Sequence, residues 1–417
     1  MIRAEKCRFT PGMKRSVGIF FGLLLFYGAP AQAQVAIQFT DVTAAAGIKK
    51  GEQYSAVNFH SLGIDWIDFN NDGRPDLFAV NGFNRTAHLY KNQGNGTFLQ
   101  RDDLLPTLRK DLDMGGAVFA DYDNDGDDDI FIFTDYKGFS LVGPNEFSGP
   151  PDFLLQNQGP PDYNFVDVAA TAGVDDLSSP SPAFGLEAGH RSMTGGWLDY
   201  DRDGCLDLYV GHWVLQSDTV DGPDAGPGSI ANKDRLYRNN CQGAPNTTFT
   251  DVTDLTGIYP NPAPSDVVPL MSGAAPTGLS CTGINCYYRP TLAFIGAHLN
   301  SPVDGGPAGD LDPDMYVVNV HDYDPLSFDF IFKNNGNSTF TDVTSAGDNP
   351  AAVPPAIIGD DAGAGMGIDV ADIDLDGDWD VYMSDILASQ DEKAPGSAPY
   401  GNVLYINQFT QTGQLKF

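Results

Sequence analysis

Short apolar runs alternate with polar, glycine-rich stretches along almost the whole chain, and they predict strands rather than helices. Four of the clearest runs directly follow an aspartate-rich stretch, at residues 77–80, 130–133, 208–210 and 381–383. Runs this short, bounded by Asp, Asn and Gly, are typical of buried strands between tight turns. Apolar residues at helical spacing are nearly absent, and residues 39–48 and 166–174 allow at most one helical turn each. The pattern therefore predicts an all-β fold.

Two further strand signatures recur in step with these runs. One is an apolar pair that leads to an asparagine, at Asn92, Asn157, Asn239, Asn334 and Asn407. The other is a strand that begins with phenylalanine, at Phe165, Phe249 and Phe340, with a weaker version at Phe98. Several short strands repeated as a unit are typical of a β-propeller, in which small antiparallel sheets are arranged radially. A parallel β-helix also repeats and binds calcium, but its repeat is much shorter, so we expect a propeller.

The aspartate-rich stretches share one arrangement of oxygen-bearing side chains. Acids or an amide stand at the first, third and fifth positions, glycine at the sixth, a variable residue at the seventh and aspartate at the ninth. The four copies consist of Asp68, Asn70, Asp72, Arg74 and Asp76; Asp121, Asp123, Asp125, Asp127 and Asp129; Asp199, Asp201, Asp203, Cys205 and Asp207; and Asp372, Asp374, Asp376, Asp378 and Asp380.

This spacing suits calcium. Ca²⁺ binds about six to eight oxygen ligands, and alternate residues of a tight loop can aim three side chains at one ion while glycine permits the sharp turn. The seventh residue then needs to supply only its backbone carbonyl oxygen. An EF-hand is excluded because the closing acid comes too early and a strand follows. Solvated acidic turns are the alternative, but four copies with identical spacing favour four calcium sites.

The long interval between the third and fourth copies contains a decayed copy. His298 occupies its first position, Asn300 its third, and an insertion separates them from Asp310 and Asp314, which precede the apolar run 315–318. The sequence therefore predicts no complete calcium site in this copy. With it, five repeat units are recognisable.

The loop–strand units resemble the FG-GAP or VCBS repeats of integrin α-chain propellers. The recurring phrase Phe-Thr-Asp-Val-Thr resembles the exported cartilage-acidic-protein and UnbV-like relatives, and the resemblance covers nearly all of residues 39–417. It implies an extracellular calcium-binding propeller with ligand roles at the matched Asp and Asn positions, and by family analogy seven blades. The chain departs from the family in lacking Phe-Gly at most repeat starts and an integrin-binding Arg-Gly-Asp. Either the strand at Phe39 completes the last blade, or further blades follow Phe417.

Charge and the N-terminal residues bear on location and partners. The net charge of −33 has no basic patch to offset it, which argues against nucleic acid and anionic membranes as partners. Basic residues before an apolar run at 17–27, followed by Ala31-Gln-Ala33, predict a signal peptide at residues 1–33. An uncleaved anchor is the alternative. We expect residues 34–417 to form one propeller domain that does not insert into a membrane after signal cleavage. We expect this domain to be secreted or on the cell surface; in a bacterium, it would lie in the periplasm or on the outer surface.

Four cysteines remain after signal cleavage, and an even number in an exported chain predicts two disulfides. Cys205 precedes the predicted strand at 206–210, and Cys241 follows the strand at 236–238. If these strands pair antiparallel, the two cysteines lie side by side. Cys281 and Cys286 would then close a small local loop.

The sequence favours a binding function over catalysis. Polar residues end the strands after the loops, at Asn81, Thr134, His212, Asn319 and Asp385; they either ring one face or channel mouth, or end their strands in solvent. His190, His212, His298 and His321 are candidate acid–base groups, but no nucleophile elbow or zinc-binding helix accompanies them. We therefore assign no catalytic residue, and expect an adhesion or recognition module for an extracellular protein or glycan. An extracellular carbohydrate-active enzyme on the same scaffold is the alternative.

Overall fold

The computed structural model describes residues 39–48, 63–80, 87–108, 112–137, 151–176, 192–212, 234–244, 247–258, 291–299, 312–319, 329–343, 365–385 and 402–409. The chain divides into two compact units, residues 1–42 and 43–417. In the first unit, the described residues 39–42 form neither helix nor strand, and Phe39 is 95% exposed. Every described strand belongs to the second unit.

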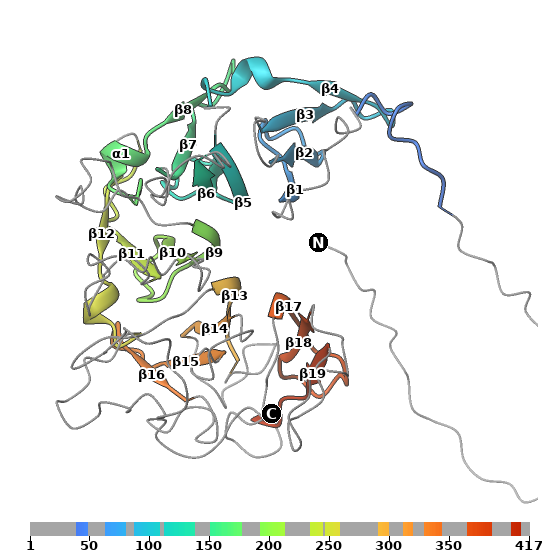
Figure 1. The fold of residues 1–417 in the computed structure, drawn as a ribbon. Coiled ribbons are helices and arrows are strands. Elements are labelled where there is room, and N and C mark those ends of the chain that lie inside the picture. The colour runs from blue at the N-terminus through green and yellow to red at the C-terminus, as the bar shows by residue number, and fades with distance from the viewer. Residues whose placement is uncertain are drawn as a thin grey trace, which may run out of the picture. The chain divides into compact units, whose positions relative to one another are not determined.

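The second unit contains five antiparallel sheets, called blades 1 to 5 in chain order (Figure 1). The first three blades consist of β1 (Ile64–Ile67), β2 (Asp76–Ala79), β3 (His88–Asn92) and β4 (Phe98–Gln100); β5 (Leu112–Ala120), β6 (Asp129–Lys137), β7 (Phe153–Asn157) and β8 (Phe165–Asp167); and β9 (Ser192–Leu198), β10 (Asp207–His212), β11 (Arg235–Asn239) and β12 (Phe249–Asp251). The other two consist of β13 (Thr291–Ala297), β14 (Asp314–Asn319), β15 (Phe330–Asn334) and β16 (Phe340–Asp342); and β17 (Gly365–Ala371), β18 (Asp380–Asp385) and β19 (Val403–Tyr405).

The blades follow one another as in a β-propeller, which confirms the predicted fold class. The first strands of successive blades contact each other, β1 with β5, β5 with β9, β9 with β13 and β13 with β17 (Figure 1). In the described part of the chain, helical structure is limited to single turns, as predicted: α1 (Ala169–Ala172) and the 3-10 turns η1 (Asp102–Leu104) and η4 (Thr253–Leu255). Among the described residues, no helix has the length and apolar character needed to cross a membrane.

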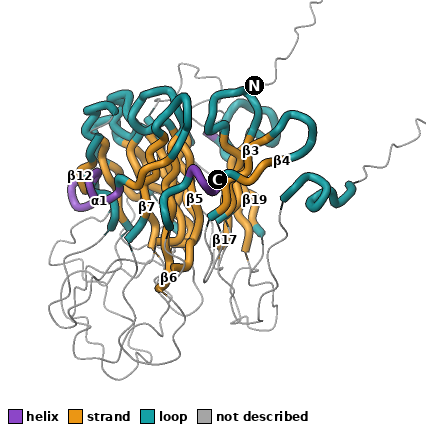
Figure 2. Tube along the Cα trace, turned by 90° about the horizontal axis from the view of Figure 1, so that it is seen from above, coloured by secondary structure: helices purple, strands orange, loops and turns teal. Residues whose placement is uncertain are grey.

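One register relation is the same in every blade. The last residue of the first strand pairs with the aspartate that opens the second, as in Ala120 with Asp129 and Leu198 with Asp207. Blades 1, 4 and 5 repeat the relation. Because the acidic loops connect exactly these two strands in blades 1, 2, 3 and 5, the shared register puts them all at one end of the strands, where Figure 2 shows many of the described loops.

The strand that opens each blade is absent from the sequence prediction, which recognised only three strands per unit. Several of these strands contain glycines where the blades meet, at Gly115 and Gly116 in β5, Gly195 and Gly196 in β9, and Gly296 in β13. A Cβ atom on Gly115 would lie 2.8 Å from the carbonyl oxygen of Ser192 and 2.9 Å from Cα of Met193. Both distances are too short for any side chain, so the close contact of β5 with β9 depends on glycine.

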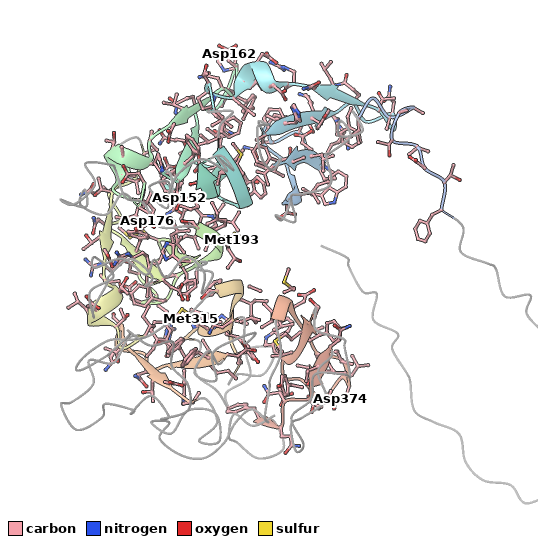
Figure 3. All side chains as sticks on the ribbon, in the orientation of Figure 1. Asp152, Asp162, Asp176, Met193, Met315 and Asp374 are labelled. Carbon is pink, nitrogen blue, oxygen red and sulfur yellow. A yellow bond between two sulfur atoms is a disulfide. The ribbon has the colours of Figure 1, made fainter. Side chains whose placement is uncertain are left out.

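The hydrophobic core consists of layers between blades, which side chains fill (Figure 3). Between blades 1 and 2, Phe78 and Leu89 pack with Ile130 and Leu155. Equivalent clusters join blades 2 and 3, blades 3 and 4, and blades 4 and 5. Blades 2, 3 and 4 therefore bury side chains against both the blade before and the blade after.

The turn after the fourth strand of a blade packs on the fourth strand of the next blade. The carbonyl oxygen of Thr256, after β12, accepts the N–H of Phe340 at the start of β16 at 2.6 Å, and Ala46 does the same for Phe98 in blade 1 at 2.7 Å. A Cβ on Gly257 would lie 2.8 Å from the carbonyl oxygen of Phe340. The turn after β12 therefore fixes blade 3 to blade 4, which explains the glycine found eight residues after the start of the Phe-Thr-Asp-Val phrase, at Gly47 and Gly257.

Candidate metal sites in the blade loops

The four complete acidic loops, numbered after their blades, are loop 1 (68–76), loop 2 (121–129), loop 3 (199–207) and loop 5 (372–380). They fold alike. In loop 2 the first aspartate, Asp121, accepts the N–H of Asp125 at 2.9 Å and the N–H of Gly126 at 3.0 Å. The same pair of bonds is found in loops 1, 3 and 5. The conserved geometry turns the backbone tightly around the acids.

Two residues of each loop have positive φ. The sixth residue is glycine in all four loops, with φ between 79° and 96°. The fourth residue is Asn71, Asn124, Arg202 or Leu375, with φ of 53°, 59°, 60° and 63°. Asparagine adopts this conformation readily, whereas Leu375 adopts it at a cost. All four loops thus share one conformation although their fourth residues differ.

Acids predicted from the sequence converge in three of the loops. The converging groups are Asp121, Asp123 and Asp129 in loop 2; Asp199, Asp201 and Asp203 in loop 3; and Asp372, Asp374 and Asp380 in loop 5. Within each group, one oxygen of every residue lies within 4.8 Å of the others. Other predicted residues have different contacts: the Oδ1 of Asp127 accepts a bond from Nδ2 of Asn71 at 2.8 Å, which joins loops 1 and 2.

Several of these carboxyl oxygens are buried without a hydrogen-bond donor. Among the described residues, Oδ1 of Asp123, Oδ2 of Asp129 and Oδ1 of Asp201 accept no hydrogen bond. Burial raises the pKa of Asp129 to about 9 and that of Asp207 to about 8, with neighbouring acids adding to the effect. Buried oxygens without donors are costly, and a bound cation would satisfy them. An all-oxygen ligand set suits a hard cation such as Ca²⁺.

Loop 1 contains its own donors and cations. Nδ2 of Asn70 donates to Oδ2 of Asp76 at 2.8 Å. The guanidinium of Arg74 lies 2.5 Å from Oδ2 of Asp72, and Nζ of Lys91 lies 3.5 Å from the same oxygen. Burial raises the pKa of Asp76 to about 6, less than for its counterparts in loops 2 and 3. The acids of loop 1 are therefore compensated by nearby protein cations and donors to a greater degree than those of loops 2 and 3.

Blade 4 contains the interrupted copy. His298 and Asp314 lie at its two ends, and Asn300 and Asp310 lie outside the described residues. A guanidinium nitrogen of Arg202, from loop 3, lies 3.3 Å from Oδ1 of Asp312. Asp312 corresponds to Asp127 of loop 2, which also contacts the fourth residue of the preceding loop. The contact between neighbouring loops is thus kept where the copy itself has decayed.

The predicted disulfide between Cys205 and Cys241 is present, with Cα atoms 5.7 Å apart. It ties the seventh position of loop 3 to the residue two places after Asn239. Cys281 and Cys286 lie outside the described residues.

The recurring asparagines have a role that the sequence did not reveal. Four of the five, Asn157, Asn239, Asn334 and Asn407, lie at or just beyond the end of the third strand and bind two loops at once. Among the described residues, Asn92 of blade 1 binds only its own loop, at Asp76 and Pro75. In each of the four, the backbone N–H donates to the ninth aspartate of its own blade, and the side-chain Nδ2 donates to the second carbonyl of the preceding loop. The second set of bonds joins Asn157 to Phe69, Asn239 to Tyr122, Asn334 to Tyr200 and Asn407 to Leu299, at 2.8, 2.9, 2.7 and 2.7 Å. A long-range contact of this kind leaves no local signal beyond the repeated asparagine.

The polar residues at the strand ends neither ring an exposed face nor end in solvent where the structure describes their side chains. Thr134, His212 and Asn319 are all buried, with 0%, 0% and 1% exposure. The N–H of each donates to the aspartate just before the third strand of its blade, at 2.7–2.8 Å. The side chains of Asn81 and Asp385 lie outside the described part of the chain.

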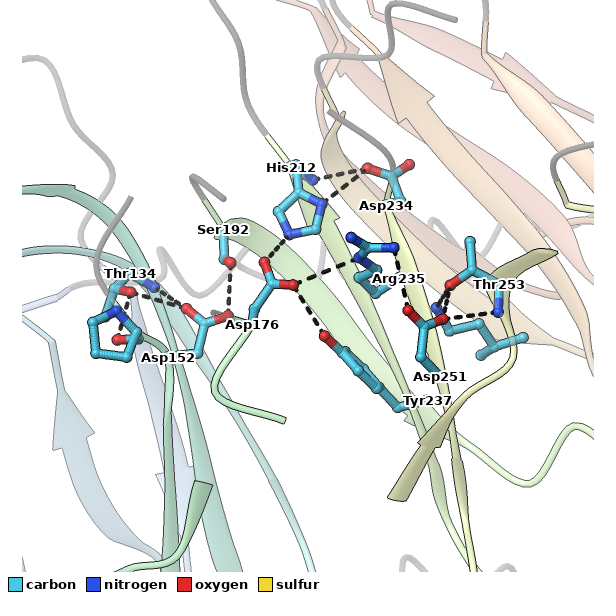
Figure 4. A network of polar contacts seen from close by, with 12 residues as sticks. Thr134, Asp152, Asp176, Ser192, His212, Asp234, Arg235, Tyr237, Asp251 and Thr253 are labelled. Atoms are coloured by element: carbon cyan, nitrogen blue, oxygen red, sulfur yellow. Dashed lines mark hydrogen bonds and ion pairs between the residues drawn. The ribbon is translucent and has the colours of Figure 1, made fainter. Parts of the chain in front are cut away.

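His212 belongs to a buried network between blades 2 and 3 (Figure 4). Its Nε2 lies 2.7 Å from Oδ2 of Asp176, and Oδ1 of the same carboxylate accepts the hydroxyl of Tyr237 at 3.0 Å. Nearby, Oδ2 of Asp152 accepts the hydroxyl of Ser192 at 2.6 Å. Burial and the charge of Asp176 raise the pKa of Asp152 well above its usual value. The network therefore links blades 2 and 3 through buried side chains. His190 and His321 lie outside the described residues.

Comparisons with known proteins agree with the fold and loops. A family model described as the FG-GAP-like repeat matches residues 68–132, from loop 1 into β6. Cartilage acidic protein 1 of Mus musculus and that of Homo sapiens are each 26% identical over 175 residues, which is 42% of this chain and 23% and 22% of theirs. The Xenopus tropicalis protein is 26% identical over 168 residues. The matched part spans less than a quarter of the length of these relatives.

Two solved structures show only distant similarity. One is an Agrocybe aegerita lectin described as recognising non-reducing terminal N-acetylglucosamine; it is 16% identical, with 78% of this chain and 61% of that chain covered and a TM-score of 0.37. The other is the Photorhabdus luminescens Tc holotoxin pore, 17% identical, with 80% and 11% covered and a TM-score of 0.32. Blades and loops together define a β-propeller with acidic loop repeats. The family and sequence matches confirm its resemblance to FG-GAP-repeat propellers.

Proposed function

We propose that this chain is an exported calcium-binding β-propeller that serves as a recognition or adhesion module for a protein or glycan. The observation that carries the calcium assignment is the set of buried carboxyl oxygens without donors in loops 2 and 3. In loops 2 and 5, Ca²⁺ would bind the first, third and ninth acids, and in loop 3 the first, third and fifth. The ion would neutralise carboxylates that otherwise repel one another at close range.

Export is supported by the predicted signal peptide and by the disulfide between Cys205 and Cys241, because disulfides persist mainly in oxidising compartments. The resemblance to cartilage acidic protein points the same way. A rigid propeller with loops at its ends is suited to binding, since binding residues are concentrated on loops held by a stable scaffold. The buried, hydrogen-bonded position of His212 gives the enzyme alternative no support from that residue.

Calcium binding is tested by metal analysis of the purified chain after dialysis against dilute calcium. Asp123→Ala should lower the calcium content by about one ion per chain, because it removes a converging ligand from loop 2. Asp312→Ala is the matched control, since it removes a buried acid from the interrupted copy and should leave the content unchanged. Equal losses in the two variants would contradict the assignment of loop 2.

Recognition is tested by screening the calcium-loaded chain on a glycan array and against immobilised extracellular-matrix proteins, with a polysaccharide-degradation assay in parallel. We expect saturable binding without degradation. Binding should fall after chelation, because loss of calcium would loosen the blades. Degradation of a polysaccharide with turnover would favour the enzyme alternative instead.

A further inference from the structure

We propose that the asparagines ending the third strands are positioning residues that couple calcium binding in neighbouring blades. The inference rests on the proposed calcium binding and concerns how the sites influence one another. Loops 1, 2 and 3 would then bind calcium as a coupled row, whereas loop 5 would bind independently.

Within its own blade, the asparagine orients the ninth aspartate. The N–H of Asn157 donates to Oδ1 of Asp129 at 2.7 Å, and the N–H of Asn239 donates to Oδ1 of Asp207 at 2.8 Å. The second carboxyl oxygen of each is thereby turned away from the asparagine. In Asp129 this is the buried Oδ2, which accepts no hydrogen bond from the described residues. Asn157 therefore holds the carboxylate of Asp129, the ninth residue of loop 2, in the position that a cation would use.

In the preceding blade, the same asparagine holds the peptide between two ligands. Nδ2 of Asn239 donates to the carbonyl oxygen of Tyr122, which lies between the converging residues Asp121 and Asp123 of loop 2. Fixing this carbonyl fixes the direction of the peptide from which Asp123 projects. Asn157 acts in the same way on Phe69 in loop 1 at 2.8 Å. Each asparagine thus supports ligands in two loops.

The contacts join neighbouring loops, and around loop 3 they form a continuous hydrogen-bonded row. Asn239 donates to Oδ1 of Asp207, and Oδ2 of Asp207 accepts the N–H of Tyr200 at 3.0 Å. The carbonyl of Tyr200 in turn accepts from Asn334 of the next blade at 2.7 Å. A cation that orders loop 3 therefore orders atoms shared with both neighbours. Coupling between sites requires a physical connection of this kind.

In blade 4 the hydrogen bonds of the row are present, but the calcium site is incomplete. Asn334 and Asn407 keep both of their bonds. The copy between them, however, has histidine at its first position, and its first and last residues are separated by an insertion. Asn334 therefore supports ligands in loop 3 alone, and Asn407 supports ligands in loop 5 alone. This difference supplies matched controls within one molecule.

The experiment compares alanine variants of the four asparagines by calcium titration calorimetry, with circular dichroism at saturating calcium to confirm folding. Asn157→Ala and Asn239→Ala should each weaken two sites, by about fivefold or more at each, which is the lower end of typical coupling. Asn334→Ala and Asn407→Ala should each weaken one. A merely structural role would lower the melting temperature of all four variants without producing this two-to-one difference in the number of weakened sites.

A second measurement avoids the asparagines altogether. Asp123→Ala disables loop 2, and the remaining sites are then titrated. We expect the sites of loops 1 and 3 to weaken and that of loop 5 to stay unchanged. The inference is overturned if all remaining sites keep their affinity, or if Asn239→Ala and Asn407→Ala weaken equal numbers of sites. A wild-type chain that binds no calcium would instead refute the proposed function itself.

Discussion

Removal of calcium is expected to destabilise the propeller strongly. In loop 2, the oxygens of Asp121, Asp123 and Asp129 lie within 4.8 Å of one another. Without a cation, these acids must either repel one another or bind protons. Burial and mutual repulsion already raise the pKa of Asp129 to about 9, so the metal-free loop is electrostatically unfavourable near neutral pH.

The magnitude follows from mass action. Extracellular calcium modules typically have dissociation constants of about 10⁻⁴–10⁻³ M. At calcium roughly tenfold above that constant, one site stabilises the folded chain by about 1.4 kcal/mol. The three loops with converging acids then contribute about 4 kcal/mol, and loop 1 adds less because Arg74 and Lys91 already lie beside Asp72. A typical domain is stable by only about 5–15 kcal/mol.

The assay is a thermal melt followed by circular dichroism, in chelator, in calcium and in magnesium at matched ionic strength. We expect the melting temperature in calcium to exceed that in chelator by about 5 °C, because an unfolding entropy of about 2.1 cal/mol/K per residue over 417 residues gives about 1.1 °C per kcal/mol. Magnesium should restore little of the difference, because its strict octahedral geometry and firmly held water suit these loops poorly. In limited proteolysis, the chain should be cleaved most slowly in calcium and faster in magnesium and in chelator.

Indistinguishable melting temperatures in chelator and calcium would refute the calcium-loop interpretation. Equal protection by magnesium and calcium would refute the geometric part of it and leave only charge neutralisation. A shift confined to high protein concentration would point to calcium-driven association rather than to the loops.

The remaining predictions concern pH, the disulfide and a buried acid. Because the pKa of Asp129 is about 9 in the metal-free fold, above its unfolded value of about 3.9, protonation stabilises that fold at low pH and the benefit is lost as pH rises through about 9. The melting-temperature gain from calcium should therefore be larger at about pH 8 than at about pH 5, and the reverse order would contradict it. Replacing Cys205 and Cys241 by serine should lower the free energy of unfolding by about 3 kcal/mol in a urea titration, for a link across 36 residues; an unchanged midpoint would contradict this. Asp152→Asn should cost less than about 1 kcal/mol, because the raised pKa of this buried carboxyl already favours its neutral form, whereas Asp152→Ala should cost about 3 kcal/mol by leaving buried donors unpaired; equal costs in urea titrations would refute this.

Much of the fold is predictable because its loops and outer strands have local sequence signatures. The Asp and Gly spacing of loop 2 reflects a local backbone requirement, since Asn124 and Gly126 have positive φ. The asparagine at the end of β7 and the phenylalanine that opens β8 were recognisable because they recur at the same place in other units. The disulfide could also be predicted, because antiparallel pairing of β10 with β11 brings Cys205 near Cys241.

Features that depend on neighbouring blades were not predictable. The first strands depend on close contact between blades, as at Gly115, and no recurring sequence signature marked them. The side chain of Arg74 ends beside Asp72, although sequence spacing assigned that residue only a backbone role. Thr134 is buried because Asp152 accepts its N–H at 2.8 Å, and nothing near Thr134 in the sequence indicates that partner.

The turn after each fourth strand also bears on how such chains can be enlarged. Since the turn after β12 contacts Phe340 of the next blade, a copied segment that contains one blade and the turn after its fourth strand carries the connector to the blade that follows. Tandem duplication of that segment would insert a new blade whose junctions repeat contacts already present in the chain. Gene duplications of one whole repeat should therefore yield folded products of different lengths.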